Sequence, residues 1–179
     1  STPREVRGAG LAYVPEERMR DGVIGDFTVA ENLILLDHNA EPYCRRGVLH
    51  MRNVAERAVT LVERFNVKTP TIDTITRSLS GGNIQKLILA RELSAEPTVL
   101  VASQPTRGVD IGAAEYIHRR LVEERDRGTA ILVISEDLDE VLALADRVAV
   151  MFEGRLMAVR DRTAVRVEEI GLLMAGSEA

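Results

Sequence analysis

The sequence predicts an α/β fold in which part of a parallel-sheet core carries a helical lobe. Residues 98–102 and 129–135 are continuous apolar runs of strand length, as buried parallel strands are, and a helical pattern at 112–127 separates them. Residues 28–95 are mostly of helical pattern. With 179 residues, 45% of them apolar, the chain is long enough to bury a core.

The first half of the chain is expected to hold one short strand and then helices. Residues 11–14 form a strand candidate that Pro15 ends. Thr28, with Glu31 three residues later, has the form of a capping box, so a helix should begin there. Further expected elements are a loop at 38–50, an amphipathic helix at 51–65, a loop at 66–78, and a helix that opens at Ser80-Gly81-Gly82.

The second half alternates strands with helices. This rhythm over residues 98–152 predicts a parallel sheet with helical crossovers, since parallel neighbours cannot be joined by a tight turn. Gly128 is placed to end the helix at 112–127. The later expected elements are a helix at 137–145, a strand at 147–152, a turn at Glu153-Gly154, a strand at 156–159 and a helix at 167–174.

Composition excludes several classes of function. The net charge of −5 argues against a general nucleic-acid binder, which needs a basic face. No apolar run approaches the roughly 18 residues of a membrane span, and the start lacks a signal-peptide pattern. The single cysteine, Cys44, excludes an internal disulfide and fits a reducing cytoplasm. His38, His50 and His118 show no ligand spacing, so no metal site is expected in this chain.

The most specific local feature is Ser80-Gly81-Gly82 at the start of a helix. Two explanations apply to these three residues alone. Serine and glycine are ordinary capping residues, so the segment is explained as a plain helix start. Alternatively, glycines let an anion approach the free amides and the positive end of the helix dipole, so the segment is explained as a phosphate site.

Five segments, in order, resemble motifs of ABC-type ATPases. Leu79 to Lys86, which reads Leu-Ser-Gly-Gly-Asn-Ile-Gln-Lys, resembles the signature motif of that family. The other four are Tyr13 to Arg18 (Q-loop), Pro105 to Asp110 (end of the Walker B strand and D-loop), Ile131 to Asp139 (switch strand) and Arg147 to Leu156 (closing hairpin). Because the resemblance covers nearly the whole chain, it implies the family's fold and activity.

The sequence of Gln104 to Ala113 resembles the corresponding segment in the second ATPase half of tandem importers for simple sugars and nucleosides. This resemblance implies a partial P-loop NTPase core with a parallel sheet and a helical signature subdomain. The implied boundaries are 1–27 for the Q-loop segment, 28–95 for the signature lobe and 96–179 for the remaining core. The phosphate loop G-x-x-x-x-G-K-[ST] is absent from the sequence, and family order would place it upstream of residue 1.

Four positions depart from the family pattern. Ser103 and Gln104 stand where the magnesium-holding aspartate and the catalytic glutamate are usual, Glu136 replaces the switch histidine, and Glu16 replaces the Q-loop glutamine. A serine lacks the carboxylate that Mg²⁺ prefers, and a neutral glutamine is a poor base for water. No catalytic set is therefore intact, and the chain itself is expected to be inactive.

The signature segment departs less from the family pattern than those four positions do, and its one difference is Asn83 where glutamine is usual. The resemblance implies that Ser80, Gly81, Gly82 and Asn83 close over ATP held by a second ATPase half, and that Asp110 acts across the interface between the halves. It implies ATP and Mg²⁺ as cofactors of the full-length protein, and a peripheral location at the cytoplasmic face of the membrane. The implied partners are the other ATPase half, transmembrane permease subunits and, indirectly, a solute-binding protein, with no nucleic acid.

Two other functions stay open at this stage. This ATPase half could be a regulatory or scaffold module that dimerises and docks membrane subunits without hydrolysing ATP itself. DNA-repair ATPases share a signature motif, but their long coiled-coil heptads and basic surface are missing here.

Loss of the strand that leads into the phosphate loop should also leave apolar sheet edges unpaired, which predicts self-association of the chain.

Overall fold

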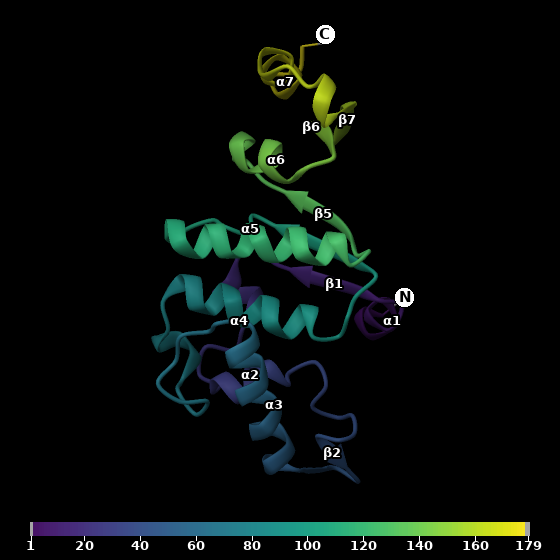
Figure 1. Ribbon diagram of the computed structural model, residues 1–179. Coiled ribbons are helices and arrows are strands. Elements are labelled where there is room, and N and C mark those ends of the chain that lie inside the picture. Colours follow the sequence, from purple (N-terminus) through teal and green to yellow (C-terminus); the bar gives the residue numbers. More distant parts are fainter. Residues whose placement is uncertain (1, 178–179) are drawn as a thin grey trace. The chain divides into compact units, whose positions relative to one another are not determined.

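The computed structural model describes residues 2–177, and these form two compact units, Ser1–Ile134 and Ser135–Ala179 (Figure 1). The predicted boundaries 1–27, 28–95 and 96–179 follow motifs rather than compactness and stay a prediction. Along residues 2–177, no helix combines the length and the apolar character that a bilayer crossing requires. The elements of the first unit are α1 (Pro3–Gly8), β1 (Leu11–Val14), a π-helical turn (Arg18–Gly22), α2 (Val29–Leu33), β2 (Cys44–Arg45), β3 (Val48–Leu49), α3 (Met51–Arg64), a 3₁₀ turn (Thr76–Ser78), α4 (Gly81–Leu93), β4 (Val99–Ser103), α5 (Ile111–Asp126) and β5 (Ala130–Ile134).

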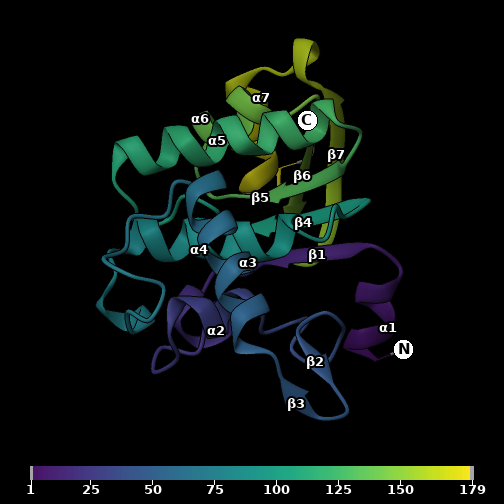
Figure 2. The same ribbon diagram turned by 60° about the horizontal axis from the view of Figure 1, so that its bottom comes forward.

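The sheet of the first unit is parallel and has the order β1–β4–β5. Leu11 pairs with Val99, and Val99 pairs with Ala130, so the three strands begin level with one another. Figure 2 shows α4 and α5 side by side on one face of this sheet. Among residues 2–177, β5 has a strand partner on one side only, and its Leu132 side chain is 55% exposed. An apolar sheet edge is thus open, as expected from the sequence.

Helix α4 is the centre of the first unit. It contacts β1, α2, α3, α5 and the π-helical turn, and every residue from Ile84 to Leu93 is buried. A helix enclosed on all sides cannot show the one-sided apolar stripe of a surface helix. The polar residues that it carries into the core must therefore find partners inside the protein.

A buried network of charges joins α4 to the first strand. Glu92, only 1% exposed, accepts hydrogen bonds from Arg7 Nη2 at 2.7 Å, from Arg91 Nε at 3.1 Å and from the Tyr13 amide at 3.3 Å. Arg91 Nη2 donates to the carbonyl of Gly22 at 2.8 Å. The Glu92 carboxylate therefore fixes α1 and β1 against α4, and Arg91 fixes the turn after β1 there.

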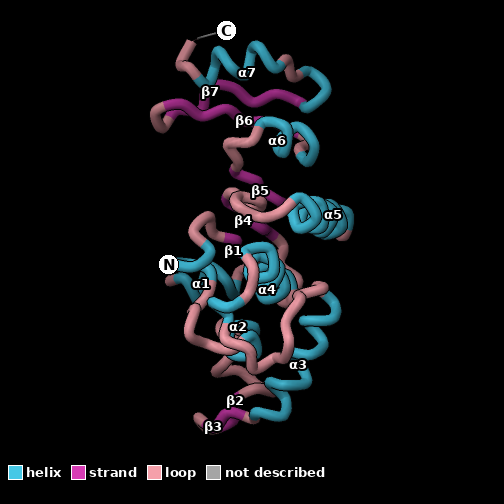
Figure 3. The backbone as a smooth tube through the Cα atoms, turned by 90° about the vertical axis from the view of Figure 1, so that its left-hand side faces the viewer, coloured by secondary structure: helices cyan, strands magenta, loops and turns pink. Residues whose placement is uncertain are grey.

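The lobe around α2 and α3 is mainly helical, as the sequence predicts, but the bounds of its elements differ from the prediction. Thr28 and Glu31 form both capping-box bonds, Thr28 N to Glu31 Oε2 at 2.8 Å and Glu31 N to Thr28 Oγ1 at 3.2 Å. α2 ends at Leu33, so the apolar residues that follow belong to turns. Residues 38–50 were expected to be a loop, and they contain the short β2–β3 hairpin, which Figure 3 shows near the start of α3.

The second unit consists of α6 (Leu138–Leu144), β6 (Arg147–Phe152), β7 (Arg155–Asp161), a 3₁₀ turn (Arg162–Ala164) and α7 (Val167–Met174). β6 and β7 form an antiparallel hairpin whose turn, Glu153-Gly154, has positive φ at both residues (43° and 76°), as the predicted Gly-containing turn requires. Val148, Val150, Ile170 and Leu173 form its core.

One expectation about the sheet is wrong. The strand at 147–152 was expected in the parallel sheet, but in the described structure β6 is hydrogen-bonded only to β7, and β1 is the third parallel strand. A strand pattern in the sequence identifies a strand without identifying its neighbours. The tight turn after Phe152 fixes the local antiparallel partner, whereas parallel pairing depends on distant segments.

Candidate functional site

The start of α4 presents free backbone donors. Ser80 is the N-cap residue and is exposed, and its hydroxyl oxygen accepts a hydrogen bond from Asn83 Nδ2 at 2.9 Å rather than from a backbone amide of the first turn. The amides of Asn83 and Ile84 both donate to the Ser80 carbonyl at 3.0 Å. The amides of Gly81 and Gly82 have no acceptor within the helix, so the positive end of the helix dipole is open to an anion.

The two glycines are also required by close packing. A Cβ atom on Gly81 would lie 2.8 Å from Arg18 Nη2, and one on Gly82 would lie 2.7 Å from the Cβ of Ala113. Both distances are shorter than real Cβ contacts. The first turn of α4 is therefore held against Arg18 on one side and against the first turn of α5 on the other.

Arg18 ties the Q-loop segment to the D-loop. Its Nη1 and Nη2 donate to the carbonyl oxygens of Arg107 at 2.6 Å and of Gly108 at 2.9 Å. Arg107 in turn forms an ion pair with Glu16. Sequence reasoning placed Glu16 and Arg18 in the Q-loop segment but missed this ion pair and the contacts of Arg18, because no spacing in the chain links residues about ninety positions apart.

Asp110, predicted to lie in the D-loop, caps α5. Its Oδ1 accepts a hydrogen bond from the Ala113 amide at 2.9 Å, and its other oxygen lies close to the position that a Gly82 Cβ would occupy. The signature segment and the D-loop are therefore packed directly against each other. A shift of either one would move the other.

The remaining predicted site residues lie at two places. Ser103 ends β4, and Gln104 follows it with a left-handed φ of 48° while its amide donates to the Ile134 carbonyl at 2.7 Å. Glu136 belongs to the second unit, directly before Asp137, which caps α6 by accepting from the amides of Asp139 and Glu140. The structure thus brings Glu16, the signature and the D-loop together in the first unit.

The two residues at the predicted magnesium and catalytic positions, Ser103 and Gln104, carry no carboxylate. Ser103 supplies a hydroxyl and Gln104 an amide, whereas Mg²⁺ is held through carboxylates and phosphates. Among residues 2–177, no three His, Cys, Asp or Glu side chains gather closely enough to hold a metal ion. The side chains of Ser103 and Gln104 therefore do not fit the metal ion that the family resemblance implies.

Lys86, the last residue of the signature segment, and Tyr116 of α5 have shifted pKa values. Burial lowers the pKa of Lys86 and the charge of Lys68 lowers it further, while Asp110 acts against both effects. Burial raises the pKa of Tyr116. Lys86 Nζ lies 4.6 Å from the centre of the Tyr116 ring, so a cation–π contact joins α4 to α5 beside the signature.

Comparisons with known sequences agree with these motifs. A family model described as ABC transporter matches residues 2–107. The guanosine import ATP-binding protein of Bacillus subtilis is 43% identical over 98% of this chain and 34% of its own length. The nucleoside import ATP-binding protein of Lactococcus lactis is 42% identical over 97% of this chain, and the glucose import ATP-binding protein of Haloferax volcanii is 40% identical over 98%. The chain spans about a third of the length of these relatives, 34%, 34% and 32% respectively.

Comparisons with solved structures give the same fold. A nucleotide-free ATP-binding cassette from an ABC transporter matches with a TM-score of 0.73 and 26% identity, over 98% of this chain and 68% of that one. A dimeric ATP-binding cassette bound to ADP and Pi matches with a TM-score of 0.71 over 88% of this chain and 65% of that one, and at 20% identity it supports the fold alone. The predicted α/β fold with a parallel sheet is confirmed, and the chain belongs to the ABC transporter family of ATPase domains.

Proposed function

We propose that this chain is part of the second ATP-binding half of an importer for nucleosides or simple sugars. The relatives that match nearly all of it are named as guanosine, nucleoside and glucose import ATP-binding proteins. Because the chain spans about a third of them, 34% in the first case, the importing activity belongs to a longer protein. In that protein ATP binding and hydrolysis would be coupled to solute uptake.

The central part of the proposal is that this half has a degenerate site of its own. Ser103 and Gln104 offer no carboxylate for Mg²⁺ or for activating water, and Glu136 would repel a γ-phosphate. Glu16 is engaged by Arg107 instead of standing free for a metal or water. Each substitution removes one component of hydrolysis, so the chain itself is expected to be inactive.

The observation that carries the proposal is the open start of α4. The Gly81 and Gly82 amides and the exposed Ser80 hydroxyl lie at one end of a 13-residue helix that the core holds on all sides. Such a rigid group of donors stabilises an anion without reorganising. Its proposed ligand is the ATP held by the partner half, with Asn83 orienting the Ser80 hydroxyl through their 2.9 Å hydrogen bond.

The same arrangement suggests how the two halves communicate. Asp110 fixes the start of α5 and packs beside Gly82, while the backbone of Arg107 and Gly108 is held by Arg18. A nucleotide that closes on the signature would therefore press on the D-loop and, through Arg18, on the Q-loop segment. ATP and Mg²⁺ are the proposed ligands of the full-length protein at its intact site.

Membrane subunits are proposed to dock beside the Q-loop. Met19, Ile24, Phe27 and Ile75 are exposed apolar residues around the loop before α2, and we call them the docking patch. A Cβ on Gly25 would lie 3.3 Å from Met19 Cε, and Ile75 is bridged to Thr28, so these segments are neighbours.

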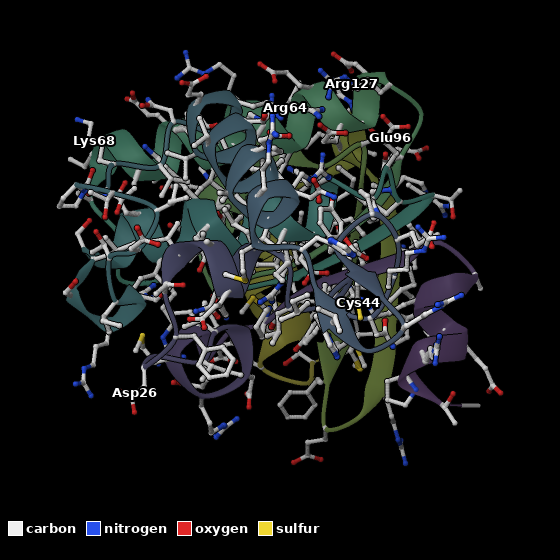
Figure 4. All side chains as sticks on the ribbon, turned by 90° about the horizontal axis from the view of Figure 1, so that it is seen from below. Asp26, Cys44, Arg64, Lys68, Glu96 and Arg127 are labelled. Carbon is white, nitrogen blue, oxygen red and sulfur yellow. The ribbon has the colours of Figure 1, made fainter. Side chains whose placement is uncertain are left out.

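A charged rim borders the docking patch. Asp26, labelled at the edge of the molecule in Figure 4, pairs there with Arg77. An apolar patch with such a rim suits a helix of a permease subunit at the cytoplasmic membrane face. A solute-binding protein would act only through that permease.

Mutation of the longer protein tests the proposal against the scaffold alternative. Ser80→Ala removes one donor to the partner's ATP and should lower ATP turnover by at least about tenfold, since single transition-state donors contribute about 10²–10³ in rate. Gln104→Ala, the matched control, should leave turnover unchanged. If Ser80→Ala leaves turnover unchanged, the half is a scaffold and the signature does not act in trans.

A further inference from the structure

An open pocket of about 300 Å³ lies between α4 and α5 and is also lined by Asn66 and Lys68, which follow α3. We propose that it binds a small, multiply charged oxyanion such as phosphate. The residues that carry the proposal are Lys68, Lys86, Tyr116 and Arg119, all of which line the pocket. Gly82 and Asn83 also line it, whereas Ser80 and Gly81 do not, so the pocket adjoins the group of donors proposed to face the partner's ATP and extends away from it along α4 and α5.

The pocket has an excess of positive charge in a chain whose net charge is −5. Lys68, Lys86 and Arg119 line it against a single carboxylate, that of Asp110, which already caps α5. Within residues 2–177, none of the three cations forms an ion pair with a carboxylate. Cations that converge on a concave site without a counter-charge favour an anionic ligand.

Lys86 is the deepest of the three cations. It is 8% exposed, and its Nζ donates to the Asn66 carbonyl at 3.3 Å while it faces the Tyr116 ring. An ammonium group has three donors, so one carbonyl leaves capacity for oxygens of a ligand. Burial and Lys68 both oppose the charge on this lysine, and a bound anion would counter both effects.

Tyr116 adds a neutral donor. Its hydroxyl is buried and has no hydrogen-bond partner among residues 2–177. Burial raises the pKa of this phenol, so it stays protonated and can donate. An unpartnered buried hydroxyl is uncommon in native proteins and indicates a missing acceptor. A phosphate oxygen between Lys86 and Arg119 would supply that acceptor.

Binding of inorganic phosphate and pyrophosphate to the purified chain tests the proposal. Calorimetry at low ionic strength should show saturable binding that weakens as salt is added. Arg119→Gln should weaken it by about tenfold through loss of a charge-assisted contact, and Tyr116→Phe should weaken it several-fold with little change of shape. Arg125→Gln, on the same helix but outside the pocket, is the matched control and should bind as the unaltered chain does.

A second readout is the Lys86 side chain itself. Phosphate at saturation should raise its pKa in ¹⁵N NMR of the labelled chain, which a purely structural role of Lys86 would not produce. AMP bound with the same dependence on Arg119 would support the proposal and identify a nucleotide phosphate as the source of the anion. Equal phosphate affinity of Arg119→Gln and the unaltered chain would overturn it. So would loss of binding in Ser80→Ala alone, or no binding of phosphate at all.

Discussion

Gly82→Ala tests whether the signature helix and the D-loop helix are in contact as the structure has them. The new methyl carbon would lie 2.7 Å from the Cβ of Ala113 and 3.2 Å from Asp110 Oδ2, whereas carbon atoms pack best at about 3.5–4.0 Å. Alanine gains about 1 kcal/mol over glycine in a helix, and overpacking of this kind costs about 1–3 kcal/mol. The expected result is a net loss of about 1 kcal/mol in the free energy of unfolding.

Urea unfolding followed by far-ultraviolet circular dichroism measures this loss as a lower midpoint with an unchanged slope. Gly8→Ala is the matched control in the same unit, because a Cβ there meets no atom within 4 Å. That variant should be as stable as the unaltered chain or slightly more stable. If Gly82→Ala is as stable as Gly8→Ala, α4 and α5 are not packed as described and the proposed link between signature and D-loop fails.

Three further predictions concern stability and association. Glu92→Gln should cost about 3 kcal/mol in thermal unfolding, since it leaves the buried Arg91 without its counter-charge; a loss below about 1 kcal/mol would mean that the network is loose. The open edge at Leu132 should make the chain self-associate in sedimentation velocity, and Leu132→Lys should reduce this; a monodisperse monomer at high concentration would contradict it. Lys86 has a lowered folded pKa, so the unfolded state binds more protons between that pKa and about 10.4. Stability should therefore rise with pH across that window in a Tyr116→Phe background, and a slope that Lys86→Met leaves unchanged would contradict the assignment.

Elements that depend on local pattern were predicted well from the sequence. Residues 11–14 and 167–174 are a strand and a helix with those same bounds, and the capping box at Thr28 forms as expected. α1 was missed although it had a signal of the same kind. Thr2 and Glu5 form a capping box around Pro3 at the first helical position.

Features that depend on distant parts of the chain were beyond the sequence. The Glu16–Arg107 ion pair and the contacts of Arg18 join positions about ninety residues apart, and no periodicity encodes them. The sequence predicted that a helix begins at Ser80, and Ser80 is the N-cap of α4, because a helix start depends on local residues. It did not show that Gly82 packs on the start of α5, because packing depends on the final fold.

The proposed degenerate site is tested most directly by inactivating the other half of the longer protein. On the proposed arrangement, replacing the water-activating glutamate of that half with glutamine should remove its turnover and leave Ser103, Gln104 and Glu136 as they are. If this half has no working site, as proposed, ATP hydrolysis should fall to the background of the assay. Turnover that remains at about half the original rate would show that the site containing Gln104 hydrolyses ATP, and would contradict the account.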